Sequence, residues 1–288
     1  MVIATLIAAG RLDERLLGAA CARLPAARLA RWIDQGSAAD LNCNANPTTV
    51  RAALGGWEGV DVIAHPPGPR AKQLLVADMD STMIGQECID ELADYAGVKP
   101  QVAGITERAM RGELDFAAAL AERVALLEGL GEEVIAQCLA ERVRPNPGAA
   151  TLVRTMAARG ATTLLVSGGF TAFADPVAQQ LGFGRVEANV LEIADRRLTG
   201  RVNGRIVDSA HKLAALESTR KSLGLSADQV MAVGDGANDA PMIEAAGLGI
   251  AYRAKPALVR SADARLDHHG LDALLWAQGI PNADWIDS

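Results

Sequence analysis

Aromatic residues are scarce in this chain of 288 residues, which has four Trp, four Phe and two Tyr. So few rings argue against a platform on which nucleic-acid bases stack. Basic residues are outnumbered as well, with 28 Lys and Arg against 35 Asp and Glu. A nucleic-acid binder needs a basic surface to neutralise phosphates. We therefore expect no nucleic-acid partner, and a small molecule instead.

Long apolar runs are also missing, since none approaches the roughly 18 residues of a membrane span. The apolar start of the chain has no basic residues before it, which argues against a signal peptide. The four cysteines are widely separated and form no CxxC pair, which argues against a zinc site or a disulfide framework. The sequence thus predicts a cytoplasmic protein with free thiols and no membrane contact.

Half of the residues are apolar and 22% are charged, as in globular proteins. The densest Pro and Gly stretch, His65-Pro-Pro-Gly-Pro-Arg70, is typical of a linker and divides the chain into residues 1–70 and 71–288. In the first part, the patterns predict a strand over 2–8, a helix over 15–23 and a closing strand over 61–64. We expect a small α+β domain there.

The second part alternates apolar strand-like runs with helical patterns. Runs over 74–77, 162–166 and 229–233 are typical of buried parallel strands, and helices are expected between them. A hairpin is expected over 190–207, with its turn at Asn203-Gly204. Residues 86–145 show only helical periodicity and form an insert. The fold class is therefore α/β: a Rossmann-like parallel sheet with an inserted helical domain.

Polar side chains follow three of these strands directly. They stand in DMDST (78–82), in SGG (167–169) and in GDGAND (234–239). Ligands of parallel α/β sheets bind beyond the carboxyl ends of the strands, where these segments are expected to meet. A further cation, Lys212, stands near the start of a predicted helix.

Each signal has an ordinary alternative when taken alone. Asp80 could cap a turn, the Ser-Gly-Gly segment could be a flexible connection, and Lys212 could be a solvated helix residue. Two acidic strand ends together favour a divalent cation. Asp78 and Asp80 would face one way on an extended segment, and Asp235 and Asp239 would bring two more carboxylates to the same edge. Oxygen ligands of this kind suit Mg²⁺. The serine and glycines would form a phosphate cradle at a helix N-terminus.

These four features, in this order, resemble the haloacid dehalogenase superfamily of phosphatases, whose pattern is DxD[ST]T, then Ser or Thr, then Lys, then GDGxND. Over roughly 72–275 the chain also resembles the phosphoserine phosphatase subgroup, in DMDSTMIGQECIDELADYAG, ITERAMRGELDFAAALAERVALLEGL, LLVSGGF, EANVLEI and GDGANDAPMIEAAGLGIAYRAKP. The first 70 residues resemble the ACT-like region of bacterial members. In this resemblance the inserted helices are a cap over the site.

The resemblance implies Mg²⁺-dependent hydrolysis of O-phospho-L-serine, the last step of serine biosynthesis, through an aspartyl-phosphate intermediate. Asp78 would be the nucleophile, and Asp80 the acid and base. The metal would be bound by Asp78, the Asp80 carbonyl and Asp235. The acidic excess of the chain would then belong partly to a metal site and would not repel an anionic substrate.

The resemblance also implies which residues bind the substrate. Ser167, the Gly168 amide and Lys212 would hold the phosphate, with Asn238 beside them and Asp239 in support. In the insert, Glu87 would pair with the ammonium and Arg123 with the carboxylate of the amino acid. Met110 and Phe116 would provide apolar cover, and Gly85 and 144–147 would be hinges of the cap.

Two other functions stay open at this point. The enzyme could transfer the phosphate to another alcohol, such as homoserine, because the acceptor subsite has no motif. Alternatively, the chain could be a catalytically silent regulatory protein that binds amino acids. The N-terminal region could bind serine for feedback, mediate a homodimer or only cover apolar surface.

Overall fold

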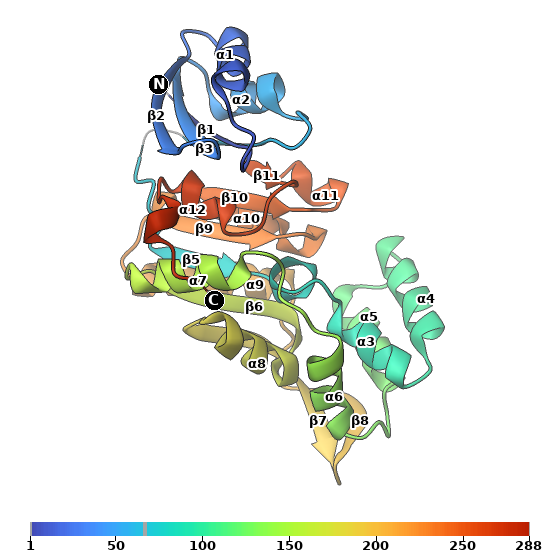
Figure 1. The fold of residues 1–288 in the computed structure, drawn as a ribbon. Coiled ribbons are helices and arrows are strands. Elements are labelled where there is room, and N and C mark those ends of the chain that lie inside the picture. The colour runs from blue at the N-terminus through green and yellow to red at the C-terminus, as the bar shows by residue number, and fades with distance from the viewer. Residues whose placement is uncertain (1, 66–67, 288) are drawn as a thin grey trace.

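The computed structural model describes residues 2–65 and 68–287, which form two units, each with its own β-sheet (Figure 1). The last element of the N-terminal unit is β4 (Asp61–His65), and the first of the larger unit is β5 (Leu74–Ala77). Residues 66 and 67, in the segment expected to be a linker, lie outside the described residues.

The N-terminal unit is a four-stranded antiparallel sheet with two helices, in the chain order β-α-β-β-α-β. Its strand order, β2-β3-β1-β4, is the ferredoxin-like arrangement. The helix expected over 15–23 is present, and the Asp13 carboxylate caps it by accepting the N–H of Leu16 at 2.7 Å. The remaining elements are β1 (Val2–Ile7), α1 (Glu14–Arg23), β2 (Arg28–Asp34), β3 (Ala38–Cys43) and α2 (Pro47–Leu54).

Buried polar groups hold the N-terminal unit against the larger one. The Asp61 carboxylate accepts the backbone N–H groups of residues 267–269 and a ring N–H of His269. The Arg70 guanidinium donates both to Asp40 in the N-terminal sheet and to the carbonyl of Ala277. Separating the two units would leave these groups without partners, which is costly for buried polar atoms.

The larger unit contains a seven-stranded sheet in the order β11-β10-β9-β5-β6-β7-β8, whose strands run parallel except for the β7–β8 pair. The predicted α/β class is therefore confirmed. Its elements after β5 and the insert are α7 (Ala149–Ala158), β6 (Thr162–Phe170), α8 (Thr171–Leu181), β7 (Arg185–Ala194), β8 (Arg197–Asn203), α9 (Ser209–Ser222), β9 (Val230–Gly234), α10 (Ala240–Ala245), β10 (Leu248–Tyr252), α11 (Pro256–Val259), β11 (Ala264–Leu266) and α12 (Ala273–Ala277).

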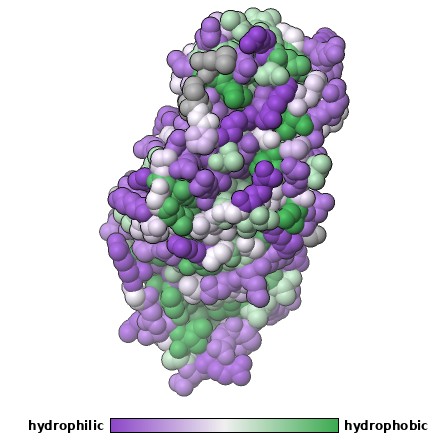
Figure 2. All heavy atoms as spheres, turned by 90° about the vertical axis from the view of Figure 1, so that its left-hand side faces the viewer, coloured by the Kyte–Doolittle hydropathy of each residue, from purple (hydrophilic) through white to green (hydrophobic). Residues whose placement is uncertain are grey.

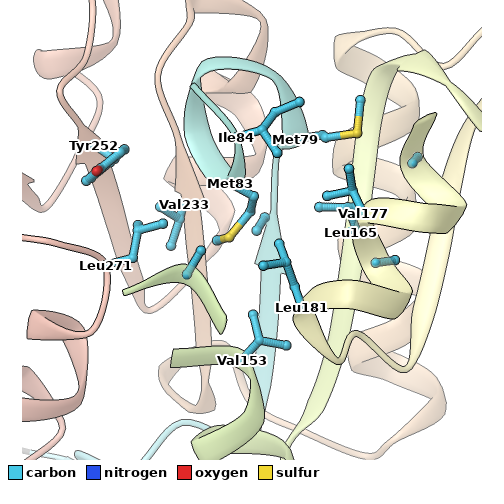
Figure 3. Packing of buried hydrophobic residues seen from close by; sticks show 14 of the residues in the cluster. Met79, Met83, Ile84, Val153, Leu165, Val177, Leu181, Val233, Tyr252 and Leu271 are labelled. Atoms are coloured by element: carbon cyan, nitrogen blue, oxygen red, sulfur yellow. The ribbon is translucent and has the colours of Figure 1, made fainter. Parts of the chain in front are cut away.

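Helices cover both faces of this sheet, so that all four residues of β5 are buried. Val76 packs with residues of α9 and α10 on one face, whereas Leu75 packs with residues of α7, α8 and α12 on the other. Figure 3 shows part of the second cluster, with Leu165 of β6, Val177 of α8 and Val233 of β9 in one apolar layer. Burial on both faces explains why the β5 sequence is a continuous apolar run.

The helical insert lies between β5 and α7, at the side of the sheet where β5 ends (Figure 1). Its two connections to the core run side by side. The Gly85 N–H donates to the Arg144 carbonyl at 3.1 Å, and the Asn146 side chain donates to the carbonyls of Thr82 and Ile84 at 2.8 and 3.0 Å. The insert consists of α3 (Cys88–Tyr95), α4 (Lys99–Met110), α5 (Phe116–Ala125) and α6 (Glu133–Glu141).

The β7–β8 hairpin differs from the prediction in its turn. The chain reverses at Asp195 and Arg196, which have φ values of 49° and 61°, and the expected turn at Asn203-Gly204 instead ends β8. Two successive residues with positive φ form the tight turn that suits a hairpin. Contact with the insert helps to place it, since the Gly129 N–H donates to the Leu198 carbonyl at 2.8 Å. The prediction of the turn at Asn203-Gly204, made from local composition alone, was therefore wrong.

None of the described helices is long and apolar enough to cross a membrane. Figure 2 shows hydrophilic residues along the whole length of the face that it displays. The four cysteines, Cys21, Cys43, Cys88 and Cys138, are free thiols, as their spacing predicts.

Candidate active site

Two central strands of the larger sheet, β5 and β9, end within one residue of each other, and β6 between β5 and β7 continues to Phe170. Ala77, the last residue of β5, pairs with Leu165 of β6 on one side and with Val233 of β9 on the other. Asp78 follows β5 directly, and Asp235 follows β9. The polar residues that follow these parallel strands come together at one edge of the sheet. Since β6 lies on one side of β5 and β9 on the other, this edge is a switch point of the topology, where ligands of α/β sheets bind.

Three buried carboxylates meet at this edge. Asp78, Asp235 and Asp239 each offer an oxygen, and these oxygens all lie within 4.8 Å of one another. Burial, together with the charge of Asp239, raises the pKa of Asp78 well above its ordinary value and that of Asp235 to about 6. The raised pKa values mean that the negative charges of these carboxylates are not fully compensated by neighbouring positive charge. A divalent cation such as Mg²⁺ or Ca²⁺ would compensate them, and carboxylate oxygens are suitable ligands for it.

Lys212 supplies one positive charge to this cluster from the first turn of α9. Its Nζ is almost fully buried and lies 2.6 Å from Asp78 Oδ2 and 2.8 Å from Asp239 Oδ1. Burial by itself would lower the pKa of Lys212, but the two carboxylates outweigh it and raise that pKa. Asp239 Oδ2 accepts the backbone N–H groups of Asp235 and Gly236 at 3.2 and 3.1 Å. Asp239 therefore fixes both Lys212 and the loop after β9.

The segment after β5 is a tight turn and not the extended segment that the sequence analysis assumed. Residues 79–83 form this turn, with Ser81 at a φ of 55°. As a result, three of the four carboxylates expected at this edge, those of Asp78, Asp235 and Asp239, form the cluster, and Asp80 is not part of it. The Asp80 carboxylate accepts the N–H of Cys88 at 3.4 Å. Burial, and then the charge of Glu87, raises the pKa of Asp80 to about 7, a value suited to both giving and taking a proton near neutrality.

The Ser-Gly-Gly segment lies within β6 and not at a helix N-terminus as expected, because β6 continues to Phe170 and α8 begins only at Thr171. The Gly169 N–H donates to Ser167 Oγ at 2.9 Å. A side chain at Gly168 would place its Cβ 3.0 Å from the Phe116 ring. Glycine at this position thus allows the insert to approach the strand end.

A cavity of about 470 Å³ opens between this edge and the insert. Of the residues predicted for the site, those that line it are Asp78, Asp80, Glu87, Met110, Phe116, Arg123, Ser167, Gly168, Asp235 and Asn238. Lys212 and Asp239 are not among the lining residues, but Lys212 contacts Asp78 and Asp239 contacts the loop after β9. Met110 stands at the rim, with 79% of its surface exposed.

Glu87 and Arg123 line the cavity from the insert. Glu87 occupies the N-cap position of α3 but makes no capping bond, and its Oε1 instead accepts the Ser81 hydroxyl at 2.7 Å. The Arg123 guanidinium donates through Nε to the Ala119 carbonyl at 3.2 Å. Within residues 2–65 and 68–287, no carboxylate lies within ion-pair distance of Arg123. The terminal N–H groups of Arg123 can therefore bind an anion.

Three residues of this site were not predicted from the sequence. Lys255 follows β10, lines the cavity and has its Nζ 3.9 Å from Asp235 Oδ2. Asp90 lines the cavity beside Glu87, and Thr82 donates its hydroxyl to Asp235 Oδ1 at 3.1 Å. The rule that pointed to Asp78 and Asp235, a polar residue after a central strand, also applies to Lys255.

Comparisons with known proteins agree with this arrangement. The family model "haloacid dehalogenase-like hydrolase" matches residues 75–244. A phosphoserine phosphatase of Streptomyces coelicolor is 46% identical over 81% of this chain and 56% of its own length. One of Albidiferax ferrireducens is 49% identical over 70% of this chain and 88% of its own length. The chain thus spans little more than half the length of the Streptomyces relative.

Solved structures show the same fold. A HAD family hydrolase of Salmonella enterica serovar Typhi superposes with a TM-score of 0.86 at 29% identity, over 96% of this chain and 98% of its own. A phospho-aspartyl intermediate analogue of a phosphoserine phosphatase gives a TM-score of 0.66 at 38% identity, over 71% of this chain and 98% of its own. With the family model covering more than half of its residues, this chain belongs to the haloacid dehalogenase-like hydrolases.

Proposed function

We propose that this chain is a Mg²⁺-dependent phosphatase that hydrolyses O-phospho-L-serine to L-serine and phosphate. The observation that carries the proposal is a single cavity that is lined by Asp78 from the sheet edge and by Glu87 and Arg123 from the insert. Such a cavity matches a substrate with a phosphate at one end and an ammonium and a carboxylate at the other. The names of the similar proteins support the same substrate.

Asp78 is the proposed nucleophile. Its Oδ1 accepts the N–H of Met79 at 2.7 Å and its Oδ2 lies 2.6 Å from Lys212 Nζ, so the carboxylate is held in one orientation. An oxygen of Asp78 forms a bond to phosphorus while the bond from phosphorus to the serine oxygen breaks, which gives an aspartyl phosphate. Water then attacks this intermediate at phosphorus, releasing phosphate and regenerating the carboxylate.

Asp78, Asp235 and the backbone carbonyl of Asp80 are the oxygen donors that we propose for Mg²⁺. Bound there, the cation would mask phosphate charge that otherwise repels an anionic nucleophile. Asp239 has a supporting role in this proposal, because it accepts from Lys212 and from two backbone N–H groups and so holds Lys212 and the loop after β9 in place.

Asp80 is the proposed acid and base. Its protonated form would donate to the serine oxygen as that oxygen leaves phosphorus. The resulting carboxylate would then take a proton from the water that attacks the intermediate. A pKa of about 7 leaves both forms accessible near neutral pH.

The phosphate oxygens are assigned to Ser167, the Gly168 N–H and Lys212, with Asn238 beside them at the cavity wall. Donors that are already in place when charge develops lower the barrier, because they need no reorganisation. Lys212 meets this condition, since two carboxylates fix its Nζ before any substrate arrives.

The amino-acid part of the substrate would contact the insert. Arg123 can bind the carboxylate through two N–H groups, and Glu87 can accept from the ammonium. Phe116 and Met110 would cover the carbon atoms between these ends. Because these four residues belong to the insert, closure of the insert over the sheet edge would both exclude water and complete the binding site.

The test is a phosphate-release panel with purified protein, with and without Mg²⁺. We expect rapid release from phosphoserine, slower release from phosphothreonine and from an aryl phosphate, and none after chelation of the metal. Equal rates with all phosphomonoesters would overturn the substrate assignment. Homoserine is added in a parallel reaction, and formation of phosphohomoserine in place of free phosphate would show that the enzyme is a phosphotransferase.

A further inference from the structure

Asn189 of β7 is fully buried (0% exposed) and joins two segments of the proposed phosphate site. Its Nδ2 donates to the Gly168 carbonyl at 2.8 Å, and its Oδ1 accepts the Val207 N–H at 2.8 Å. The residue belongs to the segment EANVLEI, which has no role in the function proposed above. A buried amide whose N–H and oxygen are both hydrogen-bonded strongly constrains the two backbone segments that it connects.

The Gly168 carbonyl needs this partner because of a bulge in β6. Ser167 pairs with Ala188 and Phe170 pairs with Asn189, so that Gly168 and Gly169 have no opposite residues on β7. Extra residues of this kind leave the regular ladder of backbone hydrogen bonds. The Asn189 side chain supplies the donor that the neighbouring strand does not.

Holding this carbonyl also orients the Ser167 hydroxyl. The carbonyl of Gly168 and the N–H of Gly169 belong to one planar peptide group and point in opposite directions. The Gly169 N–H donates to Ser167 Oγ at 2.9 Å. An oxygen that accepts in this way keeps its own O–H to donate, and a phosphate oxygen in the cavity is the acceptor that our proposal places there.

The other end of Asn189 reaches the element that carries Lys212. Val207 directly precedes Asp208, whose carboxylate caps α9 by accepting the N–H of His211 at 2.8 Å. The Asp208 carbonyl accepts the N–H of Lys212 at 3.0 Å. One side chain thus fixes the distance between the hydroxyl and the cation assigned to the phosphate.

We infer that Asn189 is a positioning residue, which orients Ser167 through the 168–169 peptide and ties it to the start of α9. The inference rests on the proposed function only for the identity of the ligand as a phosphate ester. It assigns Asn189 no contact with the substrate.

The test variant is Asn189→Asp, which keeps the side-chain volume and the acceptor for Val207 but replaces the donor to Gly168 with an oxygen. Binding of inorganic phosphate to the Mg²⁺-loaded protein is measured by calorimetry, beside kcat and KM for phosphoserine. We expect phosphate affinity and kcat/KM to fall by about tenfold or more, because a hydrogen bond is replaced by repulsion. If Asn189→Asp is insoluble, Asn189→Ser, whose shorter side chain loses both hydrogen bonds, is measured in its place.

Two controls separate positioning from general stability. Thr163→Val, at the opposite end of β6, removes another partly buried hydrogen bond, from the Gly184 N–H at 2.9 Å. It should lower the melting temperature without weakening phosphate binding. In a Ser167→Ala background, Asn189→Asp should cost less than about twofold, since its effect passes through Ser167.

Unchanged phosphate affinity in Asn189→Asp would overturn the inference, as would an equal loss in Thr163→Val or full additivity with Ser167→Ala. A wild-type protein that binds phosphate but does not hydrolyse phosphoserine would refute the proposed function. The inference would stand in that case if Asn189→Asp still weakened phosphate binding.

Discussion

Asp235→Asn should stabilise the metal-free protein while destroying its activity. Asp235 is buried next to Asp239, and its pKa rises from 3.8 to about 6. Holding it as an anion at pH 8 therefore costs about 3 kcal/mol, at 1.36 kcal/mol for each tenfold change in proton affinity. Asparagine removes the charge and still accepts from the Thr82 hydroxyl, which lies 3.1 Å from Asp235 Oδ1.

The sign of the pH dependence follows from the raised pKa. The folded protein binds the Asp235 proton more tightly than the unfolded chain does, so the wild type loses stability as pH rises from about 4 to about 6. Calorimetry in EDTA should show Asp235→Asn melting several degrees above the wild type at pH 8, at about 2–4 °C for each kcal/mol. At pH 4.5 the difference should be small.

Mg²⁺ at about a thousand times its Kd should reverse the order, because it stabilises only a protein that binds it, by about 4.1 kcal/mol at that concentration. Asp61→Asn is the control with the opposite sign. Burial raises the pKa of Asp61, but hydrogen bonds from His269 and the backbone outweigh it and lower that pKa, so its loss should destabilise. A less stable Asp235→Asn in EDTA at pH 8, or equal Mg²⁺ stabilisation of both proteins, would refute this reasoning.

Three further substitutions test the cavity. Glu87→Gln removes a charge that raises the pKa of Asp80, so the pH above which kcat/KM falls should move from about 7 to a lower value. An unchanged pH profile would show that Asp80 is not the acid. Arg123→Ala should raise KM for phosphoserine by about tenfold to a hundredfold and leave an aryl phosphate within about twofold, whereas equal losses for both would contradict a carboxylate contact. Gly168→Ala places a Cβ 3.0 Å from Phe116 and should reduce kcat/KM. Adding Phe116→Leu should partly restore kcat/KM, and no recovery in this double variant would show that the clash is not the cause.

The sequence was most informative where strands end. A continuous apolar run marks a strand buried on both faces, and the polar residues that follow such runs, Asp78 and Asp235, lie together because parallel neighbours share one edge. The insert was visible for a similar reason, since helical periodicity replaces strand patterns between 86 and 145. Lys255 follows the same rule at the end of β10 and could have been found in this way.

Features set by the backbone path could not be predicted. The turn after Asp78 leaves Asp80 outside the carboxylate cluster that it was expected to join, and this turn depends on a positive φ at Ser81 that the residue type does not predict. The hairpin turn at Asp195-Arg196 competes locally with Asn203-Gly204, and contacts with the insert decide between them. Tertiary packing outweighs local preference in both places.

The central claim is that Asp78 carries the phosphoryl group, and rapid acid quenching tests it most directly. Mg²⁺-loaded protein is mixed with ³²P-labelled phosphoserine, quenched during turnover, digested and mapped by mass spectrometry. We expect one labelled peptide, which contains Asp78 and loses its label to hydroxylamine, and no label in Asp78→Asn. A label on any other residue, or turnover by Asp78→Asn at a rate close to that of the wild type, would contradict the mechanism.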